Sequence, residues 1–158
     1  MAAAAPLVLV VNGPNLDKLG TRQPEIYGST TLGRLSDDLR LRGKELGLEL
    51  EFFQSNVESE VVAAVAGAPG RGASAILINP AALTHFSQPL REALAATGLP
   101  VVEVHISNIH AREPFRRLSL VSGVAKGVIA GLGVTGYRLA LEAIAGMVGP
   151  SPDGDARG

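Results

Sequence analysis

Short apolar runs alternate with amphipathic stretches along nearly the whole chain, and this alternation limits the possible folds more than any other feature. Residues between the apolar runs repeat with helical spacing, whereas the runs themselves have the length of strands. The sequence predicts strands at 7–11, 48–53, 75–78, 101–105 and 127–130, and helices at 32–46, 58–68, 87–96 and 134–147. Strict alternation of strands and helices is typical of right-handed crossovers and a parallel sheet.

We therefore predict an α/β fold of the flavodoxin-like type, with a five-stranded parallel sheet and helices on both faces. The order 2-1-3-4-5 is the one expected for such a fold, since the sequence itself does not fix it. The first and third runs, LVLVV and AILI, are continuous enough for strands buried on both faces. Thr30 or Thr31 can cap the first long helix, and Gly47 can end it.

The length of 158 residues fits one catalytic domain, which we place at 1–149, and the aperiodic segment 150–158 is expected to be a disordered tail. A net charge of −1 disfavours a general nucleic-acid binder. The absence of cysteine excludes disulfides and thiolate metal sites. The apolar start has no basic segment before it, and no run approaches the ~20 residues that span a bilayer. We expect a soluble cytoplasmic protein that binds neither nucleic acid nor membrane.

Polar residues concentrate directly after the predicted strands, where ligands bind in open parallel sheets. Asn12 to Asn15 follow the first strand, and a connection to about Ser29 carries Arg22 and Tyr27. This connection exceeds the usual two to six residues, and unstructured loops of such length are often lids. The third strand is followed by Asn79 and His85, and the fourth by the basic segment 105–116. A small anionic molecule is the expected ligand.

Two pairs of residues suit acid and base chemistry. Tyr27 could act as a general base if a nearby cation such as Arg22 stabilised its ionised form, because an ordinary tyrosine has a pKa of about 10. Glu103 and His105 are two positions apart on a strand and so share one face, where the carboxylate would fix the imidazole as a general acid. The alternatives are a lid tyrosine packed on the core and a strand-end histidine bonded to backbone.

Two further patterns receive less weight. A metal site from His85, His105 and His110 follows no familiar spacing of ligands. The segment 131–136, GLGVTG, matches a dinucleotide fingerprint, but no strand with an acidic residue follows it. A tight turn and close packing of helix on sheet explain these glycines better, and Tyr137 is expected to be a packing residue.

The assembled residues resemble the type II 3-dehydroquinate dehydratases. The resemblance is carried by NGPNLDKLGTRQPEIYGSTTL (12–32), INPAALTH (78–85), PVVEVHISNIHAREPFRRLS (100–119) and GVIAGLGVTGY (127–137). It implies a cofactor-free and metal-free anti elimination of water from 3-dehydroquinate through an enolate. The product, 3-dehydroshikimate, belongs to the shikimate pathway of aromatic amino acid biosynthesis or to quinate breakdown.

By the same resemblance, Tyr27 is the base and Arg22 stabilises its charge. Asn15 is similar to an asparagine that holds a water against the enolate oxygen. His105 resembles the acid that protonates the departing hydroxyl, and Glu103 orients it.

The resemblance also implies a set of binding residues. Asn79 and the Ile106–Ser107 pair would hold the substrate carboxylate, His85 and Arg116 the ring hydroxyls, while the role of Arg112 stays open. Family members are usually dodecamers of four trimers, in which an acidic residue of a neighbouring subunit reaches the site. That residue is commonly Asp, whereas the matching position here is Glu92. Asp17 and Lys18 also differ from the Asn and apolar residue common in relatives.

Two other interpretations remain open. A flavodoxin-like module that binds a nucleotide or flavin would need a phosphate loop after the first strand, which GPNLDKLG does not supply. The second interpretation is a catalytically silent relative of the family. The presence of Tyr27, Arg22 and His105 argues against it. Type I enzymes use a Schiff-base lysine, and none of the three lysines lies in a comparable cluster.

Overall fold

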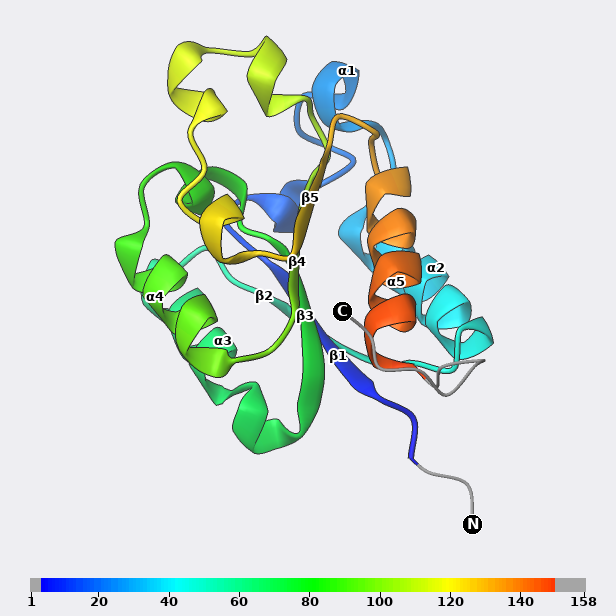
Figure 1. The fold of residues 1–158 in the computed structure, drawn as a ribbon. Coiled ribbons are helices and arrows are strands. Elements are labelled where there is room, and N and C mark those ends of the chain that lie inside the picture. The colour runs from blue at the N-terminus through cyan, green and yellow to red at the C-terminus, as the bar shows by residue number, and fades with distance from the viewer. Residues whose placement is uncertain (1–3, 150–158) are drawn as a thin grey trace.

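The predicted strands pair into one parallel sheet with the order β2-β1-β3-β4-β5, which confirms the expected topology. The computed structural model describes residues 4–149 and places helices on both faces of this sheet (Figure 1). The strands are β1 (Leu7–Asn12), β2 (Glu49–Gln54), β3 (Ala73–Asn79), β4 (Val101–His105) and β5 (Gly127–Ala130). The tail expected at 150–158 lies outside the described residues.

Side chains of the central strands alternate between two apolar clusters, one on each face of the sheet. Val8 and Val10 of β1 belong to one cluster, and Leu9 and Val11 belong to the other. All four are buried, as are the corresponding residues of β3, so the expectation of strands covered on both faces is confirmed. This double burial explains why the two segments are continuous apolar runs rather than alternating ones.

Two helices cover each face of the sheet (Figure 1). The helices α2 (Leu32–Glu45) and α5 (Thr135–Val148) pack on one side, and α3 (Glu58–Gly67) and α4 (Gln88–Thr97) on the other. Thr31 caps α2 by accepting a hydrogen bond of 3.2 Å from the backbone N–H of Arg34. Gly47, at φ 75°, follows the end of the same helix as expected.

The connection after β1 is not an unstructured loop. It contains a 3-10 turn, η1 (Leu16–Lys18), and a short helix, α1 (Pro24–Tyr27), which is drawn beyond the carboxyl ends of the strands in Figure 1. Pro24 occupies the first helical position, where its missing N–H costs nothing, and its carbonyl accepts from Gly28 N at 2.8 Å. Local hydrogen bonds therefore hold Tyr27 in one place.

Within residues 4–149, five further 3-10 turns link the elements, and three of them lie in the long connection between β4 and β5. They are η2 (Pro69–Arg71), η3 (Ala81–His85), η4 (Ile109–Ala111), η5 (Pro114–Arg117) and η6 (Ser122–Val124).

The glycines of GLGVTG serve a tight turn, at Gly131 and Gly133, and close packing, at Gly131 and Gly136, as the sequence predicted. Gly131 has φ 90°, and a Cβ there would lie 3.0 Å from the Cβ of Asn108. A Cβ on Gly136 would lie 3.4 Å from Val104 Cγ1, which brings α5 close to the sheet.

Candidate active site

A cavity of about 260 Å³ lies at the carboxyl edge of the sheet, where β1, β3 and β4 end. Ten of the twelve predicted site residues line it, although they come from three separate segments of the chain. These are Asn15, Arg22, Tyr27, Asn79, His85, His105, Ile106, Ser107, Arg112 and Arg116. The remaining two, Glu103 and Glu92, lie elsewhere: the first is buried behind His105 and the second is exposed on α4.

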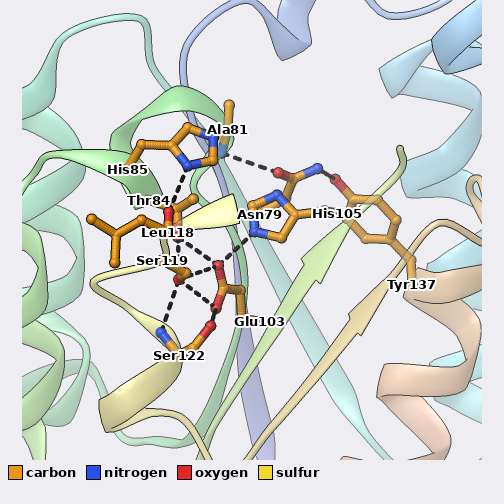
Figure 2. Close-up of polar contacts among 10 residues, drawn as sticks. All are labelled: Asn79, Ala81, Thr84, His85, Glu103, His105, Leu118, Ser119, Ser122 and Tyr137. Atoms are coloured by element: carbon orange, nitrogen blue, oxygen red, sulfur yellow. Dashed lines mark hydrogen bonds and ion pairs between the residues drawn. The ribbon is translucent and has the colours of Figure 1, made fainter. Parts of the chain in front are cut away.

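Glu103 and His105 share one face of β4, as their spacing predicted. Nε2 of His105 lies 2.5 Å from Oε2 of Glu103, and both side chains are buried (Figure 2). A carboxylate can only accept, so the imidazole donates its Nε2 hydrogen to it. The bond fixes the ring and leaves Nδ1 to exchange a proton with a bound molecule.

Three hydroxyl groups also surround the Glu103 carboxylate, and together they form what we call the hydroxyl cage (Figure 2). The hydroxyl oxygens of its members donate to the carboxylate oxygens of Glu103: Thr84 Oγ1 at 2.5 Å, Ser122 Oγ at 2.7 Å and Ser119 Oγ at 3.0 Å. Burial by itself raises the pKa of Glu103, but the hydrogen bond and charge of His105 and the hydroxyls of Thr84 and Ser122 outweigh it. The pKa of Glu103 therefore lies below its ordinary value, and the group is an ionised partner for His105.

The hydroxyl of Tyr27 accepts a hydrogen bond of 2.8 Å from Nη1 of Arg112. The same nitrogen donates to Ser107 Oγ at 3.3 Å, which ties the guanidinium to the segment after β4. Arg22 lines the same cavity, but within residues 4–149 its side chain makes no hydrogen bond to Tyr27. The cation in contact with the tyrosine is therefore Arg112, the residue whose role the resemblance left open.

Asn79 is held on both sides of its amide. Its Oδ1 accepts from the backbone N–H of Ala81 at 3.1 Å, and its Nδ2 donates to Tyr137 Oη at 2.8 Å (Figure 2). Tyr137 in turn donates to Asn12 Oδ1 at 2.7 Å. The tyrosine does pack in the core as expected, and burial raises the pKa of its hydroxyl despite the opposing hydrogen bond from Asn79. Its hydroxyl adds a polar role that the sequence did not predict.

His85 and Arg116 line the cavity, and Phe115 contacts both of them. Nδ1 of His85 donates to the Leu118 carbonyl at 2.7 Å, and the Phe115 ring meets the imidazole edge-on at 5.7 Å (Figure 2 shows the first contact). Burial lowers the pKa of His85, and the charges of His105 and Arg116 lower it further. The hydrogen bond to the Leu118 carbonyl raises the pKa but does not outweigh these effects. Arg116 pairs with Glu113 and stacks on Phe115 at 4.7 Å.

Asn15 begins the η1 turn in a left-handed conformation, with φ 71°. Its backbone N–H donates to Asn56 Oδ1 at 2.8 Å, and Gln54 Nε2 donates to the same oxygen at 3.0 Å. The segment after β2 thus anchors Asn15 at the cavity.

In the described part of the chain, no group of three or more His, Asp or Glu side chains is placed to hold a metal ion. His110, which the sequence offered as a third histidine, is exposed and does not line the cavity. Among the helices of residues 4–149, none has the length and apolarity required to cross a bilayer.

The sequence predicted no site role for five supporting residues: Thr84, Ser119, Ser122, Tyr137 and Asn56. One signal could have found the hydroxyl cage, because the glutamate in the apolar strand VVEVH must be buried and so requires donors. Nothing local identifies which hydroxyls supply them, since Thr84 and Ser119 are 35 positions apart.

Comparison with known proteins agrees with this geometry. The model of the family Dehydroquinase class II matches residues 6–145. The 3-dehydroquinate dehydratase 1 of Pseudomonas aeruginosa is 56% identical over 135 residues, covering 85% of this chain and 92% of the relative. The 3-dehydroquinate dehydratase of Nitrosomonas europaea is 53% identical over 135 residues, covering 85% and 94%.

Solved structures give the same result. The type II dehydroquinase from Propionibacterium acnes superposes with a TM-score of 0.85 at 44% identity, covering 91% of this chain and 99% of the other. That from Butyrivibrio crossotus has a TM-score of 0.88 at 38% identity, with coverages of 90% and 99%. With a family model matched over most of its length and close relatives covered almost completely, the chain belongs to the class II dehydroquinase family.

Proposed function

We propose that this protein is a type II 3-dehydroquinate dehydratase, a hydro-lyase that converts 3-dehydroquinate to 3-dehydroshikimate by cofactor-free anti elimination through an enolate. One observation carries the proposal: a tyrosine bonded to a cation and a histidine bonded to an ionised glutamate line the same small cavity. An elimination of this kind needs one residue that accepts a proton and one that donates a proton. The reaction would serve the shikimate pathway or quinate breakdown.

The first step is removal of a proton from the carbon beside the ketone. Tyr27 takes this proton as its phenolate, the C–H electron pair becomes a C=C bond, and the carbonyl π pair moves onto oxygen to give the enolate. An ordinary tyrosine is only about one part in a thousand ionised at pH 7, which corresponds to ~4 kcal/mol. Arg112 donates a hydrogen bond to this hydroxyl, and Arg22 lies in the cavity wall.

The second step expels the hydroxyl group. The enolate re-forms the ketone, the new C=C bond forms as the C–O bond breaks, and His105 donates a proton so that water leaves. The ionised Glu103 stabilises the imidazolium before transfer. Proton exchange with solvent then returns Tyr27 and His105 to their starting states. Asn15 would hold a water against the enolate oxygen.

The remaining cavity residues would bind the substrate. Asn79, the Ile106 backbone and the Ser107 hydroxyl would hold its carboxylate, and His85 and Arg116 its ring hydroxyls. Arg116 lines the cavity together with Glu113, with which it is paired.

We also propose a dodecamer of four trimers in the cytoplasm, with Glu92 reaching the site of a neighbouring subunit. Glu92 is exposed on α4, which leaves it free for such a contact. Three large apolar side chains beside cavity-lining residues are also exposed: Phe86 at 63%, Phe115 at 59% and Leu118 at 59%. Exposed apolar groups of this kind favour association between subunits.

The assay that tests the activity follows the ultraviolet absorbance of the conjugated enone. Purified protein receives 3-dehydroquinate in buffer with a chelator and without any cofactor. We expect the absorbance to rise at a rate proportional to enzyme. No rise with authentic substrate would mean a catalytically silent relative and would overturn the proposal.

Borohydride separates the two known chemistries for this reaction. Added with substrate, it reduces an imine on lysine and would inactivate a Schiff-base enzyme. We expect activity to survive, because the proposed mechanism forms no imine. Inactivation that depends on substrate would contradict the mechanism but leave the overall reaction intact.

A further inference from the structure

A buried hydroxyl connects the ends of β1 and β3, next to the cavity-lining Asn79. Tyr137, in the first turn of α5, has an exposed fraction of 0%, and its hydroxyl lies between Asn12 at the end of β1 and Asn79 at the end of β3. A buried polar atom needs partners, and this one has two of opposite kinds. The contacts of Asn79 with Ala81 and with Tyr137 are drawn in Figure 2.

The backbone of Ala81 determines which way the Asn79 amide points. An N–H can only donate, so the atom that faces Ala81 N at 3.1 Å must be Oδ1 of Asn79. The reverse orientation would set two donors against each other. The amide nitrogen must then face Tyr137, whose hydroxyl accepts from it at 2.8 Å and passes its own hydrogen to Asn12 Oδ1.

The turn that aims Ala81 N–H at Asn79 is strained. Ala81 has φ 52°, a left-handed conformation that non-glycine residues rarely adopt. Within residues 4–149 the only other non-glycine residues with positive φ are Asn15 and Gln23, and all three line the same cavity. Strain of this kind persists where surrounding structure holds it and often accompanies a binding site.

We propose that Tyr137 and the Ala81 backbone are positioning elements that fix the Asn79 amide so that it can offer only an N–H to the cavity. Asn79 Nδ2 carries two hydrogens, and Tyr137 takes one of them. The second is the group left for a ligand, while Oδ1 is committed to Ala81. This arrangement selects an acceptor atom, such as a carboxylate oxygen, over a donor such as the NH₂ of a carboxamide at that point of the cavity. The inference rests on the proposed function, because it assigns the carboxylate of 3-dehydroquinate to Asn79.

The test compares binding of 3-dehydroquinate with binding of its carboxamide analogue to the wild type and to Tyr137→Phe. The wild type is first shown to turn over substrate, so that a failure of the proposed function is recognised before any variant is measured. In Tyr137→Phe we expect KM for 3-dehydroquinate to rise about tenfold, while kcat changes less than about threefold; tenfold corresponds to ~1.4 kcal/mol. The preference for carboxylate over carboxamide should fall by a similar factor.

Matched variants separate positioning from a general effect on folding. Ile144→Val alters the buried face of the same helix without touching the hydroxyl, and it should leave KM and the carboxylate preference unchanged. Asn79→Ala should raise KM by at least as much as Tyr137→Phe, and adding Tyr137→Phe to it should cause no further rise. If Tyr137→Phe does not fold, Asn12→Leu removes the acceptor of the hydroxyl hydrogen and should lower the preference in the same direction.

An unchanged carboxylate preference in Tyr137→Phe, or in Asn12→Leu where that variant replaces it, would overturn the inference. The inference would also be overturned if Tyr137→Phe raised KM by the same factor in the wild type and in Asn79→Ala. The hydroxyl would then not act through the Asn79 amide.

Discussion

The guanidinium of Arg112 donates a 2.8 Å hydrogen bond to the hydroxyl of Tyr27, which lies 85 positions earlier in the chain. The contact joins α1, which follows β1, to the segment after β4. The guanidinium carbon of Arg112 also lies 5.5 Å from the centre of the Tyr27 ring. A phenolate accepts more strongly than a phenol, so the bond strengthens when Tyr27 loses its proton. This relationship ties the proposed base to a residue outside its own connection.

Removal of that cation should slow the proton abstraction. For Arg112→Ala we expect kcat to fall by about 100-fold, since a hydrogen bond to a charged group contributes ~1.5–3 kcal/mol and each ~1.4 kcal/mol changes a rate tenfold. Arg22→Ala should cost less in kcat, because Arg22 makes no hydrogen bond to the hydroxyl. Steady-state kinetics of both variants provide the measurement.

Arg117→Ala serves as the matched control for charge. Arg117 is exposed and does not line the cavity. Arg117→Ala therefore changes the net charge by the same amount as Arg112→Ala or Arg22→Ala but leaves the site unchanged. We expect nearly normal kinetics. A large loss in Arg22→Ala with normal turnover in Arg112→Ala would contradict the assigned order of the two arginines.

Tyr27→Phe removes only the hydroxyl that is proposed as the base. We expect turnover to fall by about 1,000-fold or more, because general base catalysis typically contributes 10²–10⁴ and no other group at this position replaces it. Substrate binding should be largely kept, since the ring remains. Titration of the variant with 3-dehydroquinate, followed by calorimetry, measures binding apart from turnover, and nearly normal turnover would remove Tyr27 from this role.

The sequence predicted the parts of the site that depend on local periodicity. The apolar runs identified all five strands, and the spacing of Glu103 and His105 placed them on one face of β4. Contacts between distant segments could not be predicted in this way. Arg112 reaches Tyr27, and Tyr137 reaches Asn79, only because the strands end at one edge of the sheet. The helical turn at Pro24 was missed because a four-residue helix carries no measurable periodicity.

The state of Glu103 predicts how stability depends on pH. Burial opposes its ionisation, but the hydrogen bonds from His105, Thr84 and Ser122 hold the pKa below the ordinary value of 4.5. A carboxyl whose pKa is lower in the folded state contributes stability that is fully present above its unfolded pKa. This contribution should be lost as the pH falls below about 4.5 and through the folded value.

Urea unfolding at several values between pH 7 and pH 3 checks this dependence. The free energy of unfolding should fall with acidity in the wild type, and the fall should be shallower in Glu103→Gln, which has no carboxyl at this position to titrate. Parallel curves for the two proteins would show that other groups account for the acid sensitivity.

The hydroxyl cage makes Thr84 a sensitive position, although it touches no predicted substrate atom. Its side chain is fully buried and donates to Glu103 at 2.5 Å. Thr84→Val keeps the shape but removes the donor from an ionised group, which costs ~1.5–3 kcal/mol. Thr84→Ser keeps the hydroxyl and loses one methyl group, which costs only ~0.8 kcal/mol of burial. We expect Thr84→Val to lower the urea midpoint more than Thr84→Ser does, at an unchanged m value. Thr84→Val should also lower kcat, because the carboxylate that orients His105 is then less firmly held. A serine variant as damaged as the valine variant would mean that the methyl group, and not the hydroxyl, supports Glu103.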